Sequence, residues 1–210
     1  MQGRKQPYHH GDLRNALVSA ATRLIETGRR DDFSLRETAR EVGVSANAAY
    51  RHFEDRSALL TEVARSGFER LSLGMQKAIN AVPACDARED ATNRFKAVGR
   101  AYVDFAFAHR ELFGVMFGAS GAPRIAPNWQ SADGGRASPY RLLEETLDEL
   151  VVQGVMAPAR RPGAEIKAWA TVHGFTRLIL DGAVQPSPDG SRDQTIEDIL
   201  DFIVSGLCGA

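Results

Sequence analysis

The sequence predicts an all-α protein made of a small N-terminal helical domain and a larger C-terminal helical domain. Apolar residues recur at the three- and four-residue spacing of amphipathic helices along most of the chain, without the alternation typical of strands. Glycines, prolines and helix-capping residues divide these stretches at intervals typical of helices. We expect the two domains to occupy residues 1–55 and 56–210.

The first predicted helix runs from Asp12 to about Thr27. Gly28 ends it, at a position where glycine commonly terminates helices. Ser34 and Glu37 stand three residues apart, which is the spacing of a capping box. This pair predicts the start of a second helix.

A glycine turn follows the second helix. Gly43 occupies a position that needs left-handed backbone, which glycine adopts without strain. Ser45 caps a third helix, which we expect to run through Tyr50 and His52. Two short helices joined in this way form a helix-turn-helix, whose second helix can enter the major groove of DNA. The sequence therefore predicts that the N-terminal domain binds double-stranded DNA.

The remaining predicted helices belong to the larger domain. Residues 118–138 are rich in glycine and proline and form a long loop, which is either functional or disordered. The expected helices run from a cap at Asp55 or Ser57 to a stop before Pro83, and then over about Arg88–Ala108, Arg110–Phe117, Pro139–Gly154, Ala164–Gly182 and Asp193–Leu207.

Composition narrows the class of protein. The formal net charge of −1 excludes a protein that coats DNA through its overall charge, so any DNA affinity must be local. No apolar run reaches the length of a membrane span, and the N-terminus lacks the apolar stretch of a signal peptide. The two cysteines, Cys85 and Cys208, do not form a disulfide framework. We expect a cytoplasmic protein that has no contact with a membrane.

Several motifs resemble one family. The runs LRNALVSAATRLIETG and GVSANAAYRHFEDRSALL resemble the DNA-binding domain of the TetR family of transcriptional repressors. Two later runs, AHRELFGVMFG and AWATVHGFTRLILDG, resemble a TetR subgroup with a Trp-x-x-x-His-Gly run, here Trp169, His173 and Gly174. The resemblance implies a repressor that binds a palindromic operator as a homodimer and is released by a small-molecule effector.

Candidate DNA contacts come from both the residues and the resemblance. Asn47 lies near the start of the recognition helix and can pair with adenine, whereas the alanines around it offer only apolar contacts. Tyr50 and His52 resemble the phosphate-contacting pair of the family, and Arg56 stands at the start of the fourth helix, where a phosphate is favoured. The candidate DNA-binding residues are Ser34, Thr38, Ser45, Ala46, Asn47, Tyr50, His52 and Arg56.

The resemblance implies an effector pocket between the fourth and seventh helices. Its candidate residues are Phe68, Met75, Tyr102, Phe105, His109, Phe113, Met116, Phe117 and Trp129. Aromatic and methionine side chains at helical spacing are also typical of an ordinary core, so that reading stays open. We expect His109 to act as a helix C-cap and His173 to be a hydrogen-bonded core histidine. Trp129 is either a lid over the effector or part of a disordered loop.

The resemblance also implies that the last two helices form a four-helix bundle across a dimer axis. They carry more apolar side chains than one chain needs to cover. The candidate interface residues are Phe175, Leu178, Ile179, Ile196, Ile199 and Ile203.

We expect no catalytic, metal or cofactor site. The histidines and cysteines lack metal-ligand spacing, and the chain has no nucleophile elbow, P-loop or dinucleotide fingerprint. This argues against an enzyme with a DNA-binding head. A second alternative is a helical small-molecule binding protein whose DNA-binding head is weakened, because the recognition helix is rich in alanine.

Overall fold

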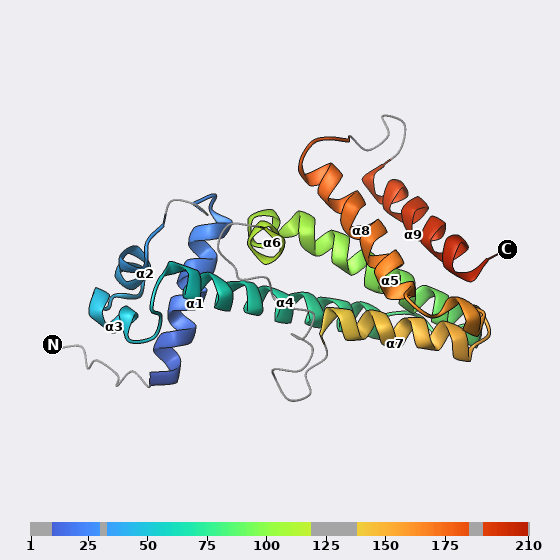
Figure 1. Cartoon of the computed structure of the whole chain (residues 1–210), viewed down its shortest axis with the longest axis horizontal. Helices are drawn as coiled ribbons and strands as arrows, with labels where there is room; N and C mark the ends of the chain where they lie inside the picture. Colours follow the sequence, from blue (N-terminus) through green and yellow to red (C-terminus); the bar gives the residue numbers. More distant parts are fainter. Residues whose placement is uncertain (1–9, 30–32, 119–137, 185–190, 210) are drawn as a thin grey trace. The chain divides into compact units, whose positions relative to one another are not determined.

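The structure is a computed structural model, and it describes residues 10–29, 33–118, 138–184 and 191–209 (Figure 1). Every regular element in these residues is helical, which confirms the all-α prediction. The elements are α1 (His10–Glu26), α2 (Leu35–Val42), α3 (Ala46–Tyr50), α4 (Arg56–Asn80), α5 (Ala87–Ala108), α6 (Arg110–Phe117), α7 (Pro139–Val152), the 3₁₀ turn η2 (Pro158–Arg160), α8 (Ala164–Leu180) and α9 (Arg192–Cys208).

The helix ends lie within about two residues of the predicted ones, and two differences concern local geometry. The recognition helix α3 ends at Tyr50 rather than continuing through His52. The N–H groups of His52 and Phe53 both donate to the carbonyl of Ala49, at 2.9 and 3.0 Å, so the chain turns out of the helix there. The other difference is η2, a short turn within the segment that we expected to be a linker.

The chain divides into two compact units. Unit 1 contains Met1–Gly67 and Glu111–Ala126, and unit 2 contains Phe68–Arg110 and Pro127–Ala210. The division at Gly67 lies inside α4, whereas the functional boundary that we expect lies between residues 55 and 56. That functional boundary stays a prediction, because compactness and DNA binding are different criteria.

Unit 1 combines α1, α2, α3, the first part of α4 and most of α6. Gly67 allows α6 to lie close to α4, since a Cβ at this position would be 2.6 Å from the sulfur of Met116. The largest buried side chains of this unit include Leu17, Ile25, Phe33, Leu35, Phe53, Leu59 and Phe113.

In unit 2, α5 packs against α7, α8 and α9, and α8 packs against both α7 and α9. Serine hydroxyls cap two of these helices, as Ser138 accepts from the N–H of Arg141 at 3.1 Å and Ser191 accepts from that of Gln194 at 3.2 Å. The buried core includes Phe95, Val98, Tyr102, Leu142, Leu147, Leu150, Ile196 and Leu200. None of the helices in the described residues has the length and hydropathy that crossing a membrane requires.

Candidate DNA-binding surface, effector residues and dimer face

The helix-turn-helix predicted from the sequence is formed by α2 and α3. The Ser34 hydroxyl accepts from the N–H of Glu37 at 3.2 Å, and the Glu37 carboxylate accepts from the N–H of Ser34 at 3.4 Å. Gly43 ends α2 in the left-handed region, with φ of 78°. Ser45 caps α3 by accepting from the N–H of Ala48 at 3.2 Å. The capping box, the glycine turn and the second cap are therefore confirmed.

Glu37 also joins the first two helices. Its carboxylate lies 2.6 Å from the Arg29 guanidinium, just beyond the end of α1, and 3.6 Å from that of Arg40. The hydrogen bond from Arg29 is the largest cause that lowers the pKa of Glu37. The first turn of α2 is thus capped by Ser34 and also joined by an ion pair to Arg29, which follows α1.

The exposed side of α3 carries two polar side chains. Asn47 is exposed and Tyr50 is 47% exposed. They are three residues apart and therefore lie on one face of the helix. Ser34 and Ser45 are also exposed, and Ala46 and His52 are half-buried.

Thr38 was predicted to contact DNA, and in the single chain its side chain is completely buried. Its hydroxyl donates to the Ser34 carbonyl at 3.1 Å and so satisfies the helix backbone. This burial does not favour a phosphate contact, which stays a prediction. The helical spacing of Thr38 from the apolar residues of α2 could have indicated this burial from the sequence.

Two arginines of unit 1 stack on aromatic rings, a feature that the sequence analysis missed. The Arg56 guanidinium carbon lies 4.8 Å from the centroid of the Phe33 ring, at the start of α4. Arg14 on α1 lies 4.9 Å from the Phe53 ring and 2.8 Å from the Glu62 carboxylate. Phe53 is 2% exposed, which confirms its expected place in the core. The stacks place the first residue of α4 beside Phe33 and the α1 residue Arg14 beside Phe53.

The candidate effector residues fall in both units and differ in burial. In unit 2, Met75 and Tyr102 are buried, whereas Phe68, Phe105 and His109 are half-buried. In unit 1, Phe113 and Met116 are buried and Phe117 is half-buried, with its ring 4.7 Å from that of Phe113. Trp129 lies outside the described residues.

His109 ends α5, as expected of a C-cap residue. Its backbone N–H donates to the Phe105 carbonyl at 2.9 Å, and its ring lies 4.9 Å from the Phe105 ring. The Arg70 guanidinium on α4 lies 3.2 Å from Nε2 of the imidazole. Since a guanidinium can only donate, the imidazole nitrogen accepts this hydrogen bond.

His173 is hydrogen-bonded, as expected, but it is half-buried rather than part of the core. Its Nδ1 lies 2.6 Å from the hydroxyl of Tyr102, which also lies 3.4 Å from the indole Nε1 of Trp169. The indole can only donate, so it donates to the Tyr102 oxygen, and we assign the Tyr102 proton to His173 Nδ1. Burial, followed by the charge of Arg177, lowers the pKa of His173, and burial raises the pKa of Tyr102. This cluster joins α8 to α5.

The predicted dimer residues are only partly available at the surface. Ile196 and Ile203 are 0% and 5% exposed in the single chain, so they belong to its core, and their place in an interface stays a prediction. Leu178 is exposed, and Phe175, Ile179 and Ile199 are half-buried. Phe202 is 67% exposed on α9, which makes it a better candidate than either buried isoleucine.

In the described residues, no group of three His, Cys, Asp or Glu side chains is arranged to hold a metal ion.

A helix-turn-helix domain followed by a helical domain defines a class of DNA-binding transcription regulators. Residues 17–63 match the family described as bacterial regulatory proteins, tetR family. Residues 95–203 match the family described as tetracyclin repressor-like, C-terminal domain. The chain therefore belongs to the TetR family, and it is a transcription regulator rather than an enzyme.

Solved structures agree with this assignment. A protein of unknown function from Rhodococcus sp. RHA1 is 35% identical over 97% of this chain and 100% of its own, with a TM-score of 0.76. A TetR family transcription regulator from Marinobacter aquaeolei VT8 is 17% identical over 92% and 94%, with a TM-score of 0.62. RolR in complex with resorcinol is 12% identical over 94% and 88%, with a TM-score of 0.61. No curated protein matches the chain.

Proposed function

We propose that this protein is a repressor that binds a palindromic operator as a homodimer and leaves it when a small-molecule effector binds. The exposed face of α3 is the observation that carries the proposal. Asn47 and Tyr50 offer an amide for a base edge and a phenol for a phosphate on one face of a capped helix. We also infer that the protein acts in the cytoplasm, where a bacterial regulator meets DNA.

The remaining DNA contacts follow from the position of α3. Ser45 and Ala46 stand at its N-terminal end, which is the end that reads bases in this motif. His52 and Arg56 follow α3 and begin α4, and we assign both to phosphates. Ser34 is exposed at the start of α2 and is assigned to a phosphate as well.

A second copy is needed because one short helix makes few base contacts. Leu178 on α8 and Phe202 on α9 are 49% and 67% exposed. Gly174 and Gly206 on the same helices face open space, since a Cβ at either position would meet no neighbouring atom within 4 Å. Exposed apolar side chains beside glycines suit close packing by another helix. We therefore infer that these faces of α8 and α9 form the dimer interface, with Phe175, Ile179 and Ile199 at its edge.

We assign effector contacts first to the candidates in unit 2, which are Phe68, Met75, Tyr102, Phe105 and His109. They combine aromatic surface with a buried hydroxyl and an imidazole, which suits a small aromatic ligand with a polar group. RolR, a structural neighbour, is bound to resorcinol, which has this chemistry. Phe113, Met116, Phe117 and Trp129 remain candidates. The effector would release DNA by favouring a conformation with lower operator affinity.

One observation favours a second candidate function. Ala49 is completely buried, and Ala46 and Ala48 are half-buried, so base recognition by α3 rests mainly on Asn47. A helical small-molecule binding protein with a weakened DNA-binding head would have this composition.

Selection from a pool of random duplexes separates the two candidates. The repressor proposal predicts that the full chain enriches one inverted repeat, and that its affinity for this site exceeds that for a scrambled duplex of equal length. The affinity for both duplexes should fall with salt, because phosphate contacts release counterions. Recovery of unrelated sequences, bound no better than the scrambled duplex, would favour the weakened head.

A further inference from the structure

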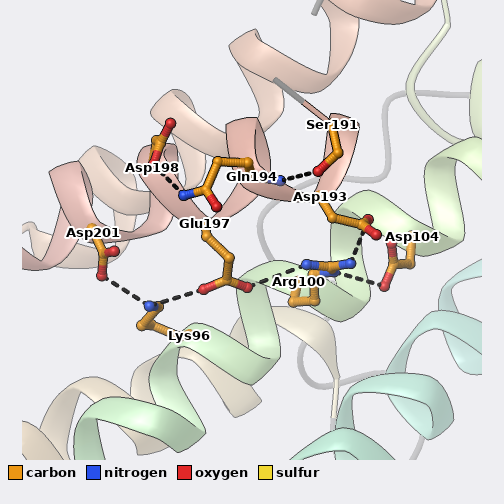
Figure 2. A network of polar contacts seen from close by, with 9 residues as sticks. All are labelled: Lys96, Arg100, Asp104, Ser191, Asp193, Gln194, Glu197, Asp198 and Asp201. Carbon is orange, nitrogen blue, oxygen red and sulfur yellow. Dashed lines mark hydrogen bonds and ion pairs between the residues drawn. The ribbon is translucent and has the colours of Figure 1, made fainter. Parts of the chain in front are cut away.

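A row of charged side chains joins α5 to α9 in unit 2. Lys96 and Arg100 lie one turn apart on α5, and Asp193, Glu197 and Asp201 lie one turn apart from each other on α9 (Figure 2). We call these five residues the α5–α9 charge row. Because Lys96 meets Asp201 and Arg100 meets Asp193, the two helices run in opposite directions.

Glu197 connects the two cations of the row. Its carboxylate lies 2.9 Å from the Lys96 ammonium and 3.2 Å from the Arg100 guanidinium. Lys96 also lies 2.8 Å from Asp201, and Arg100 lies 2.7 Å from Asp193. Asp104 adds a further contact to Arg100 at 3.2 Å. The contacts therefore form a connected network rather than separate pairs.

The cations of this network are shielded more than their partners. The side chains of Lys96 and Arg100 are 21% and 30% exposed, and that of Glu197 is 40% exposed. Burial alone would lower the pKa of Lys96, but hydrogen bonds to Asp201 and Glu197 outweigh it and the pKa is raised. The carboxylates thus compensate for the partial loss of water around the cations. A shielded network of this kind stabilises more than an isolated exposed pair does.

Charge alone does not determine the axial position of α9 along α5. Acids at every fourth residue would allow α9 to slip by one turn and meet Lys96 and Arg100 again. Gly99 and Leu200 remove this freedom. A Cβ at Gly99 would lie 2.4 Å from Cδ2 of Leu200, so Leu200 occupies the space that a side chain would need. The charge row selects the face of α9, and the Gly99–Leu200 contact selects its axial position.

The outward face of α9 depends on this arrangement. Phe202 directly follows Asp201 and is 67% exposed. Leu200, which directly precedes Asp201, is only 2% exposed. Rotation or slippage of α9 on α5 would therefore move Phe202 and bury different residues. The charge row therefore contributes to which face of α9 is exposed.

We propose that the α5–α9 charge row positions α9 for the association of two copies, so that ionic strength controls the dimer although the contacting face is apolar. This inference rests on the proposed homodimer. Salt shortens the range of the ionic contacts from about 10 Å at 0.1 M to about 3 Å at 1 M. An apolar interface by itself would not weaken with salt, since its burial is not screened.

The test measures the dimer dissociation constant of the full chain by analytical ultracentrifugation between about 0.05 and 1 M NaCl. We expect it to rise roughly five- to tenfold for the wild type. Arg100→Met and Glu197→Gln should raise it at low salt and should lose most of the salt dependence. The curves should approach one another at high salt, where screening has weakened the ionic contacts of the wild type.

A matched control comes from the exposed Arg141–Glu145 pair on α7, whose atoms are 2.8 Å apart. Arg141→Met and Glu145→Gln should follow the wild-type curve. Hydrogen exchange supplies an independent readout, because residues 192–201 should lose protection in Arg100→Met while α7 does not change. If Arg100→Met unfolds, Glu197→Gln supplies the comparison with the wild type.

A dissociation constant that stays level or falls with salt would overturn this inference and leave the proposed homodimer intact. A wild-type chain that remains monomeric at micromolar concentration would overturn both. Variants that keep the full salt dependence of the wild type would show that the salt effect arises elsewhere. This result would also overturn the proposed role of the charge row.

Discussion

At the scale of single residues, polar side chains that cap a helix differ from polar side chains that could contact DNA. Ser34 and Ser45 are both exposed, yet each hydroxyl already accepts a backbone hydrogen bond. Asn47 lies near the start of α3 and is exposed. It is therefore the residue on this helix with the greatest capacity to select a base.

Asn47→Ala and Arg56→Ala should affect DNA binding in different ways. Loss of Asn47 should relax the preference at one base position and cost about 1–3 kcal/mol there. Loss of Arg56 should weaken binding to all duplexes and reduce the salt slope by about 1 per half-site. Fluorescence anisotropy on matched duplexes measures both effects. Arg65→Ala, further along α4, is the control and should change neither. An unchanged slope for Arg56→Ala would remove Arg56 from the interface.

His173 should make stability depend on pH. Its pKa in the folded chain lies below the usual value of 6.5, because burial and Arg177 disfavour its charged form. The unfolded chain therefore binds the proton more readily. The stabilisation is present above the unfolded pKa of about 6.5 and is lost as pH falls through the folded pKa.

His173→Asn supplies the comparison, because the amide oxygen can still accept from Tyr102 but does not titrate. Urea unfolding of both chains should show that the wild type loses stability relative to the variant as pH falls below about 6.5. A difference in unfolding free energy that is the same at all pH values would contradict this account.

Residue-level predictions from the sequence are weakest where burial decides the role. Thr38, Ile196 and Ile203 have the correct helical spacing for a contact surface, but each is buried by its own chain. Periodicity shows that one face of a helix is apolar, and it does not show which chain covers that face. Membership in a subgroup with a Trp-x-x-x-His-Gly run also stays a prediction, although Trp169 and His173 both meet Tyr102.

At the scale of elements, caps and glycines explain why the helix bounds could be predicted. Ser34, Ser138 and Ser191 each accept a backbone hydrogen bond at the first turn of a helix. These signals are local, so the sequence contains them. The α5–α9 charge row is different, because Lys96 and Asp201 are 105 residues apart. Only the tertiary packing of α9 on α5 brings such residues together, and no local pattern indicates it.

Gly99→Ala tests the close packing of α9 on α5. The new methyl would lie 2.4 Å from Cδ2 of Leu200, so the Leu200 side chain must move and its packing against α5 changes. We expect a loss of about 1–3 kcal/mol in unfolding free energy, measured by chemical denaturation. Gly74→Ala is the control, because its Cβ would meet nothing within 4 Å and the change should stabilise α4. Equal effects of the two substitutions would show that the Gly99 contact is loose.

At the scale of the whole molecule, the account rests on two copies acting together. Each chain offers one short recognition helix, and a palindromic site requires two. Leu178→Asp or Phe202→Asp should therefore give monomers that bind DNA weakly while remaining folded. Leu73→Asp is the matched control, since Leu73 is 71% exposed on α4, outside α8 and α9. Dimers formed by Leu178→Asp and Phe202→Asp at wild-type affinity would place the interface elsewhere.

The mass of the protein–DNA complex tests the central claim most directly. Sedimentation equilibrium with the inverted repeat recovered by selection should show an even number of chains on each duplex. A duplex that carries only one half-site should bind at least tenfold more weakly, because one recognition helix loses its contacts. A single chain bound with equal affinity to the half-site and to the full repeat would contradict a dimeric repressor.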